Sequence, residues 1–152
     1  MPVDIAMVYD PARRCADLAW SGGDFALDTT PATAMLIAIG SDRRARSDDT
    51  LPQTIDNPDA PVSLTARRGN PGDALDPQGR RTGSRLWLMH RAKHSEAERQ
   101  RARGYLAEAM DAVGSAWGVA TQVRTEWRDT ATLVYLAQAG STKVQLAKAV
   151  GE

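Results

Sequence analysis

The sequence predicts an α+β fold, in which a small antiparallel sheet carries helices packed on one face and a long irregular loop. The predicted sheet combines an N-terminal hairpin with a C-terminal meander. Apolar and polar residues alternate near both ends of the chain, as half-buried strands require. Between them lie two segments with helical signals and a stretch without any period, and such segregation of strands from helices is typical of α+β proteins. At 152 residues we expect one domain, spanning residues 1–152.

The first forty residues are predicted to form a hairpin and a buried helix. Alternation over residues 4–10 and 16–20 predicts two strands joined through residues 11–14, and Gly22-Gly23-Asp24 then turns the chain. Thr30 followed by Pro31 is a helix start, with threonine as N-cap and proline at the first helical position. The helix should run to about residue 41 and be apolar on nearly every side.

The middle of the chain, from residue 42 to residue 81, is rich in proline and glycine and has little periodicity. A compact domain rarely contains so long an irregular segment without a use for it. Disorder is one interpretation. We favour an extended arm, at about residues 46–82, that partner subunits order by binding it.

Two further helices are predicted after this segment. Ser84 can cap a short helix through about Arg91, and Ser95 with Glu98 forms a capping box for a longer one. On the longer helix a set of apolar residues recurs at helical spacing, which predicts a buried face. That set is Ala102, Leu106, Ala109, Met110 and Val113, and Gly114, Trp117 and Gly118 should end the helix.

The last third changes to a period of two. Residues 119–127 alternate as a half-buried strand should, Asp129-Thr130 turns the chain, and strands at 132–139 and 142–148 follow around Gly140-Ser141. This pattern predicts a three-stranded antiparallel meander. Its last strand should be a sheet edge, with Thr142, Val144 and Leu146 on one face and Gln145 on the other.

Composition excludes several classes of protein. No stretch approaches the ~20 apolar residues that cross a bilayer, and the N-terminus lacks the pattern of a secretory signal, so no membrane role is expected. The single cysteine, Cys15, leaves no internal disulfide and no cysteine-rich zinc site. The net charge of zero argues against nucleic acid. This total combines a net charge of −5 over residues 1–60 with a net charge of +6 over residues 80–103. Such opposite charges suit docking between subunits.

Six short motifs, taken in order, carry a resemblance that spans most of the chain. They are Asp4-Ile5-Ala6, residues 33–37 (Thr-Ala-Met-Leu-Ile), Ser41-Asp42-Arg43-Arg44-Ala45, Arg67-Arg68-Gly69, Gly72-Asp73-Ala74-Leu75 and the run from Arg80 to Met89. The chain resembles the small baseplate wedge protein of Mu-like contractile-tailed phages, and through it the sheath-initiating wedge proteins of other contractile tails, tailocins and type VI secretion systems. It departs from the pattern at Asn70-Pro71, where aromatic residues are expected.

The resemblance implies a structural subunit of the virion, assembled in the host cytoplasm and repeated around a six-fold ring. Its implied partners are other wedge subunits, the tail sheath protein and tail tube or hub proteins. The helical side would bind the wedge, and the protein would offer a platform for the first ring of sheath. Strand addition to the edge formed by Thr142, Val144, Gln145 and Leu146 is a physical route to that platform. A lysozyme-like peptidoglycan hydrolase of the tail is the alternative.

Arg80, Arg81 and Arg85 surround a turn that leads into Trp87. One interpretation places Trp87 in the core and lets Arg85 pair with an internal aspartate. The other makes the arginines a bidentate docking point for carboxylates or carbonyls of a partner, a task that suits arginine better than lysine. Both interpretations stay open at this point.

Catalytic and metal sites find little support. His90 and His94 have the i, i+4 spacing of two metal ligands, but no glutamate follows the first histidine and no third ligand is evident, so no metal or other cofactor is expected. The acidic residues lie mostly in predicted turns, whereas a glycosidase needs one carboxyl with a raised pKa across a cleft from a second. We therefore expect a protein that is not an enzyme.

Overall fold

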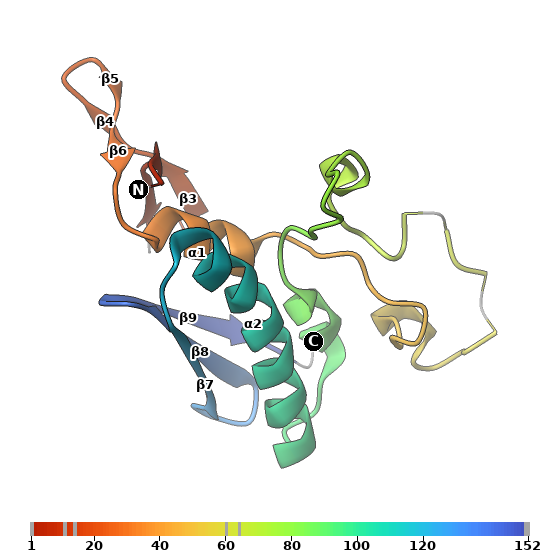
Figure 1. The fold of residues 1–152 in the computed structure, drawn as a ribbon. Helices are drawn as coiled ribbons and strands as arrows, with labels where there is room; N and C mark the ends of the chain where they lie inside the picture. Colours follow the sequence, from red (N-terminus) through yellow and green to blue (C-terminus); the bar gives the residue numbers. More distant parts are fainter. Residues whose placement is uncertain (1, 11, 14, 60, 64, 151–152) are drawn as a thin grey trace.

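The computed structural model describes residues 2–10, 12–13, 15–59, 61–63 and 65–150, and it confirms the α+β class (Figure 1). The strands are β1 Asp4–Ile5, β2 Met7–Asp10, β3 Cys15–Leu18, β4 Trp20–Ser21, β5 Asp24–Phe25, β6 Leu27–Asp28, β7 Thr121–Trp127, β8 Thr132–Ala139 and β9 Thr142–Ala149. The helices are α1 Ala32–Gly40 and α2 Glu96–Trp117, with 3₁₀ turns η1 Pro52–Thr54, η2 Pro71–Ala74 and η3 Arg85–Arg91.

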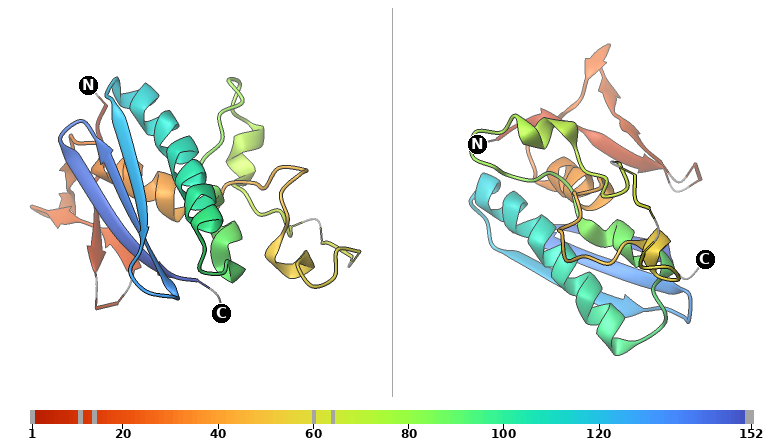
Figure 2. Two further views of the ribbon diagram at one scale, coloured as in Figure 1. Left: turned by 90° about the horizontal axis from the view of Figure 1, so that it is seen from below. Right: turned by 90° about the vertical axis from the view of Figure 1, so that its right-hand side faces the viewer.

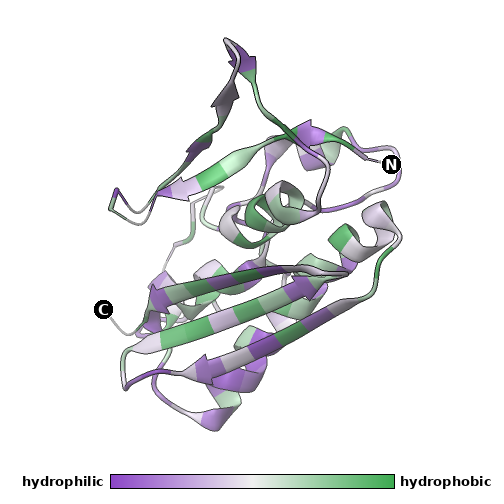
Figure 3. Ribbon diagram, turned by 90° about the vertical axis from the view of Figure 1, so that its left-hand side faces the viewer, coloured by the Kyte–Doolittle hydropathy of each residue, from purple (hydrophilic) through white to green (hydrophobic). Residues whose placement is uncertain are grey.

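The C-terminal meander forms as predicted. Its strand order is β7-β8-β9, all antiparallel, with Thr125 opposite Tyr135 and Tyr135 opposite Leu146. Helix α2 covers one face of this sheet, as Figure 2 shows, and in Figure 3 the strands lie in front with α2 behind them. The main core lies between α2 and the sheet, because the inward-facing residues of β8 are all buried there.

Helix α2 has the predicted start and the predicted buried face. The Ser95 hydroxyl accepts a hydrogen bond from the Glu98 N–H at 3.1 Å. Only this half of the predicted capping box forms, and the Glu98 carboxylate lies 3.0 Å from the Arg101 guanidinium instead. Gly118, with φ 65°, is the left-handed C-cap. The buried residues of α2 are the five predicted: Ala102, Leu106, Ala109, Met110 and Val113.

Helix α1 begins slightly later than predicted, because Pro31 itself takes the cap position and the Thr30 hydroxyl accepts from the Ala32 N–H at 3.3 Å. Met35 and Ile39 are buried against α2 and the sheet. Ile37 is 36% exposed, so the prediction that nearly every side would be buried was only partly right. Helix α1 contacts α2 and β9 and also β1 and β2, and these contacts leave Ile37 partly exposed.

The N-terminal hairpin forms, but it does not join the meander. Strands β2 and β3 pair from Met7 opposite Leu18 to Asp10 opposite Cys15, while Pro11 and Arg14 of the predicted connection lie outside the described residues. Two more ribbons, β1–β6 and β4–β5, were not predicted. The expectation of one shared sheet was wrong, because α1 lies between the ribbons and the meander (Figure 3).

The described part of residues 42–81 contains η1, η2 and one isolated bridge, from Asp42 to Ser84, and no longer element. It nevertheless covers a second, smaller core of Ala45, Leu51, Trp87 and Leu88.

No helix within the described residues is long and apolar enough to span a membrane.

Candidate functional site

The turn at Gly83 and Ser84 fastens the irregular segment to the end of α1. The Ser84 N–H donates to the Ser41 carbonyl and the Arg43 N–H to the Ser84 carbonyl, both at 2.9 Å. Gly83 has φ 88°, and a Cβ there would lie 2.5 Å from the Ser41 carbonyl oxygen. Only glycine fits so close an approach. The Ser84 hydroxyl accepts from the Leu86 N–H, which starts η3 as predicted.

Arg85, the first residue of η3, points into the protein. Its Nη1 donates to both carboxylate oxygens of Asp49 at 2.8 and 2.9 Å, and its Nε donates to Glu108 Oε2 at 2.9 Å. Its guanidinium also lies 4.6 Å from the centre of the Tyr105 ring. Burial alone would lower the pKa of Arg85, but the two carboxylates outweigh it and the pKa is raised, so the residue stays charged.

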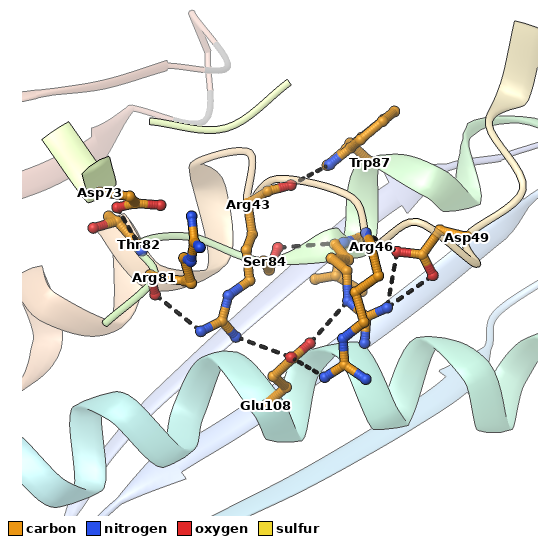
Figure 4. Close-up of polar contacts among 11 residues, drawn as sticks. Arg43, Arg46, Asp49, Asp73, Arg81, Thr82, Ser84, Trp87 and Glu108 are labelled. Carbon is orange, nitrogen blue, oxygen red and sulfur yellow. Dashed lines mark hydrogen bonds and ion pairs between the residues drawn. The ribbon is translucent and has the colours of Figure 1, made fainter. Parts of the chain in front are cut away.

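Glu108 is the acidic centre of this network, because Arg43, Arg46 and Arg85 all pair with its carboxylate. Figure 4 shows Arg43 and Arg46 reaching it. Arg46 Nη2 donates to Glu108 Oε1 at 2.6 Å, and Arg43 Nη1 lies 3.3 Å from the same oxygen. Burial would raise the pKa of Glu108, but the hydrogen bonds from Arg46 and Arg85 lower it overall. The carboxylate on α2 therefore holds two loop segments together.

Trp87 lies in the interior beside the same network. Its ring Nε1 donates to the Arg43 carbonyl at 2.8 Å, and the Arg68 guanidinium lies over the ring, 4.6 Å from its centre. Arg68 is held by Asp42 at 2.6 Å, and Arg67 donates to the carbonyls of Arg46 and Ser47. The Arg67-Arg68-Gly69 motif thus closes the irregular segment over Trp87.

The structure does not bring the predicted arginines together. Arg80 pairs with Asp76 through two nitrogens at 3.0 and 3.2 Å, Arg85 is internal, and only the Arg81 side chain is exposed without an ion pair to a described carboxylate. The Arg81 carbonyl accepts from Arg43 Nη2 at 3.1 Å. Internal pairing of Arg85 and a core position for Trp87 are the interpretations that the geometry supports.

A polar pocket of ≈ 360 Å³ opens beside Glu108, where Arg44 joins Arg81. Within the described residues neither arginine has a carboxylate at ion-pair distance, so the mouth of this pocket is basic. The other lining residues are Arg43, Ala45, Arg46, Arg85 and Glu108.

Strand β9 is a sheet edge, as predicted. Thr142, Val144 and Leu146 are half-buried, the latter two against the main core, and Gln145 is exposed on the outer face. The Lys148 Nζ donates to the Leu86 carbonyl at 3.3 Å, which ties the strand to η3. Burial lowers the pKa of Lys148, partly opposed by the charge of Asp42.

The carboxyls show no arrangement typical of hydrolysis. Wherever the pKa of a described carboxyl departs from its ordinary value it is lowered, as at Asp28, Asp76, Glu96, Glu108 and Asp129, which is the opposite of a general acid. His90 lies in the last turn of η3 and His94 lies beyond this 3₁₀ turn against Trp127, so they do not share a helix face. The described residues contain no group of three potential metal ligands.

Sequence reasoning missed Arg46, Asp49 and Glu108 as members of the site. The Ser41–Ala45 motif gave a local signal for Arg43 and Arg44. Nothing local marks Glu108, because its partners lie 23 or more positions away along the chain.

Comparison with known proteins connects this architecture to phage tails. The model of the family described as "Phage protein GP46" matches residues 31–147, from the start of α1 into β9. Over 124 residues the chain is 37% identical to the "Baseplate protein gp46" of Escherichia phage Mu, covering 81% of this chain and 77% of that protein. No solved structure matches the chain. The predicted resemblance to Mu-like baseplate proteins is thereby confirmed, and the chain belongs to the GP46 family of phage proteins.

Proposed function

We propose that the protein is a structural subunit of the baseplate of a contractile phage tail, located in the virion and assembled in the host cytoplasm. The observation that carries the proposal is the similarity to the Mu baseplate protein over most of both chains. In this proposal the subunit is a wedge component, repeated around a six-fold ring between larger wedge proteins and the tail tube or hub. Antibody labelling of purified tails should place it at the baseplate end.

The free edge of β9 is the proposed platform for the tail sheath. In an antiparallel ladder, residues with amides toward the neighbouring strand alternate with residues whose amides point away. The Val150 N–H donates to the Ala131 carbonyl at 2.7 Å, so the even-numbered residues of β9 have their amides toward β8. The amides of Lys143, Gln145 and Ala147 therefore point away from β8, where an arm of a sheath subunit could extend the sheet.

Replacing Gln145 by proline tests the platform. Proline removes an amide that the β8–β9 ladder does not use, so the isolated protein should stay folded. Gln145→Ala is the matched control, because it deletes the side chain and keeps the amide. We expect tails built with Gln145→Pro to carry baseplates and tubes without sheath, and Gln145→Ala to give normal tails. Sheathed tails from both variants would place sheath attachment elsewhere.

The exposed arginines Arg81 and Arg44 are the proposed contact with other wedge subunits. A partner carboxylate in the pocket beside Glu108 could bind either guanidinium through two parallel hydrogen bonds. Arg81→Lys keeps the charge and loses that geometry, so wedge assembly should weaken while the thermal stability of the monomer stays unchanged. Unaltered assembly of Arg81→Lys and Arg44→Lys together would remove this contact from the proposal.

The arm at residues 46–82 is proposed to gain its full order only in the assembly. The hydrogen bond from the Arg67 side chain to the Arg46 carbonyl already restrains residues 46–67 in the isolated chain, whereas η1 within them has no buried residue. Amide hydrogen exchange should therefore show protection at Ala45, whose N–H donates to the Arg67 carbonyl at 2.9 Å, and fast exchange over residues 55–63. Strong protection of residues 55–63 in the isolated protein would contradict the arm.

No catalytic activity is part of this proposal. The lowered carboxyl pKa values and the similarity to a protein named as a baseplate protein both support a protein that is not an enzyme. Purified protein should fail to clear peptidoglycan across mildly acidic to neutral pH. Turnover that a single Asp→Asn or Glu→Gln change abolishes would instead identify a hydrolase.

A further inference from the structure

Three alanines at the N-terminus form a closed triangle of backbone hydrogen bonds. The Ala6 N–H donates to the Ala26 carbonyl at 2.8 Å, the Ala26 N–H to the Ala19 carbonyl at 2.9 Å, and the Ala19 N–H to the Ala6 carbonyl at 2.9 Å. The ribbons β1–β6, β2–β3 and β4–β5 leave this triangle in three directions. We call residues 3–28 the three-ribbon unit; Figure 1 shows β4–β5 projecting away from the body.

Each alanine is flanked on both sides by a large apolar residue. The three tripeptides are Ile5-Ala6-Met7, Leu18-Ala19-Trp20 and Phe25-Ala26-Leu27. In extended chain the neighbours of a residue share the face opposite to it. The pairs Ile5–Leu27, Met7–Leu18 and Trp20–Phe25 are also directly opposite across the ribbons, so all six side chains lie on one face of the unit.

This apolar face is uncovered in the isolated protein. Trp20 is 67% exposed and Leu27 is 68% exposed, and the rings of Trp20 and Phe25 stack on each other at 4.5 Å. Of the twelve exposed large hydrophobic residues in the described part of the chain, eight belong to the three-ribbon unit. Patches of several hundred Å² on a soluble protein mark interaction sites.

The opposite face of the unit is acidic. Asp4, Asp10, Asp17, Asp24 and Asp28 fall on it, and Arg13 is the only described basic residue of the ribbons. The β6 end of this face lies against the start of α1, where Asp28 accepts from the Thr33 N–H at 3.0 Å, whereas Val8, opposite Asp17 on the same face, is 58% exposed. The ribbons form a single layer, which is thin compared with the ~10 Å over which ordinary salt screens a charge. The aspartates therefore also attract a basic partner that binds on the apolar side.

The size of the apolar face argues for a partner held by several contacts. Its side chains expose on the order of 500 Å² of apolar surface. A self-standing dimer buries about 800 Å² on each side, so two copies joined through this face alone would fall short. A neighbour in a multi-subunit assembly needs no such area, because other contacts contribute.

We propose that the three-ribbon unit docks, through Ile5, Leu18, Trp20, Phe25 and Leu27, on an apolar surface of a neighbouring tail protein flanked by lysine or arginine. This proposal rests on the proposed baseplate function. It concerns a part of the chain that precedes the segment matched by the GP46 family. Trp20 is the expected anchor, since buried tryptophans dominate interface energetics.

A photo-crosslinker placed at position 20 in the full chain, within assembled tails, identifies the partner. We expect crosslinks to a different tail protein, at an apolar segment with lysine or arginine nearby. Position 8 is the matched control, because Val8 is 58% exposed and lies opposite Asp17, on the acidic face of the same unit. Crosslinks to a second copy of this chain, to a segment without basic neighbours, or no more crosslinking than from position 8 would overturn the proposal.

A variant pair separates docking from folding and from the proposed function. Trp20→Ser with Leu27→Ser should leave the melting temperature of the isolated protein unchanged and lower its incorporation into tails at least about tenfold. Val8→Ser, on the acidic face of the unit, should be incorporated normally. Normal incorporation of the double variant would refute docking alone, whereas absence of the wild-type protein from tails would refute the baseplate function itself.

Discussion

Replacing Arg85 by methionine should destabilise the isolated protein strongly. The change removes the donors to Asp49 and Glu108 and leaves an uncharged side chain of similar length. Breaking a buried ion pair by removing one partner costs about 3–5 kcal/mol. Asp49 keeps the Arg46 N–H at 2.7 Å and Glu108 keeps the Arg46 side chain, so we expect the lower end of that range, about 3 kcal/mol.

Lysine at the same position should cost less, because one ammonium can keep one of the two carboxylates. The loss is then one hydrogen bond to a charged group, about 2 kcal/mol. Urea unfolding of the wild type and both variants at neutral pH measures the differences in the free energy of unfolding. If this free energy depends equally steeply on urea concentration in all three proteins, their unfolding transitions are comparable. Arg81→Lys is the control and should fall within about 0.5 kcal/mol of the wild type, since Arg81 is exposed.

The pH dependence gives a second measure of the same network. The pKa of Glu108 is lowered in the folded state, so its stabilisation is present above the ordinary value of 4.5 and is lost as the pH falls. The difference between the wild type and Arg85→Met should therefore shrink in acid. A variant as stable as the wild type at neutral pH, or a gap that grows in acid, would refute the assignment of Arg85 to an internal role.

The remaining predictions concern stability. The pKa of Glu96 is lowered from 4.5 to about 2 by its hydrogen bonds from Arg99 and Gln100, so its contribution to stability is lost as the pH falls from 4.5 to about 2. Glu96→Gln should therefore reduce the loss of stability in acid, and an unchanged loss would contradict this. Gly83→Ala should cost more than Gly79→Ala, which we expect near 1 kcal/mol, because both have positive φ but only at Gly83 would a Cβ meet backbone; equal urea midpoints would contradict this. Leu106→Ala, fully buried on α2, should lose about 3 kcal/mol in the same assay, and a loss below about 1 kcal/mol would mean that the core relaxes around the cavity.

The sequence determined the elements whose signals are local. The helical spacing on α2 gave its five buried residues, and Ser84 and Ser95 marked two helix starts, because a cap is a contact between residues two or three apart. The period of two predicted both ends of β8, and those of β9 to within one residue. Such patterns reflect burial on one face, which can be seen without knowing what covers it.

Only the tertiary structure decided which charges meet and which surfaces stay open. Arg80, Arg81 and Arg85 look alike in sequence, yet one pairs locally, one is exposed and one is internal, because Asp49 and Glu108 approach Arg85 from segments 36 and 23 positions away. The alternation of β2 and β3 predicted a hairpin but not the alanine triangle, whose hydrogen bonds join three separated strands. Long-range pairing leaves no local pattern, so the ion-pair network and the apolar face of the three-ribbon unit became visible only in the folded chain.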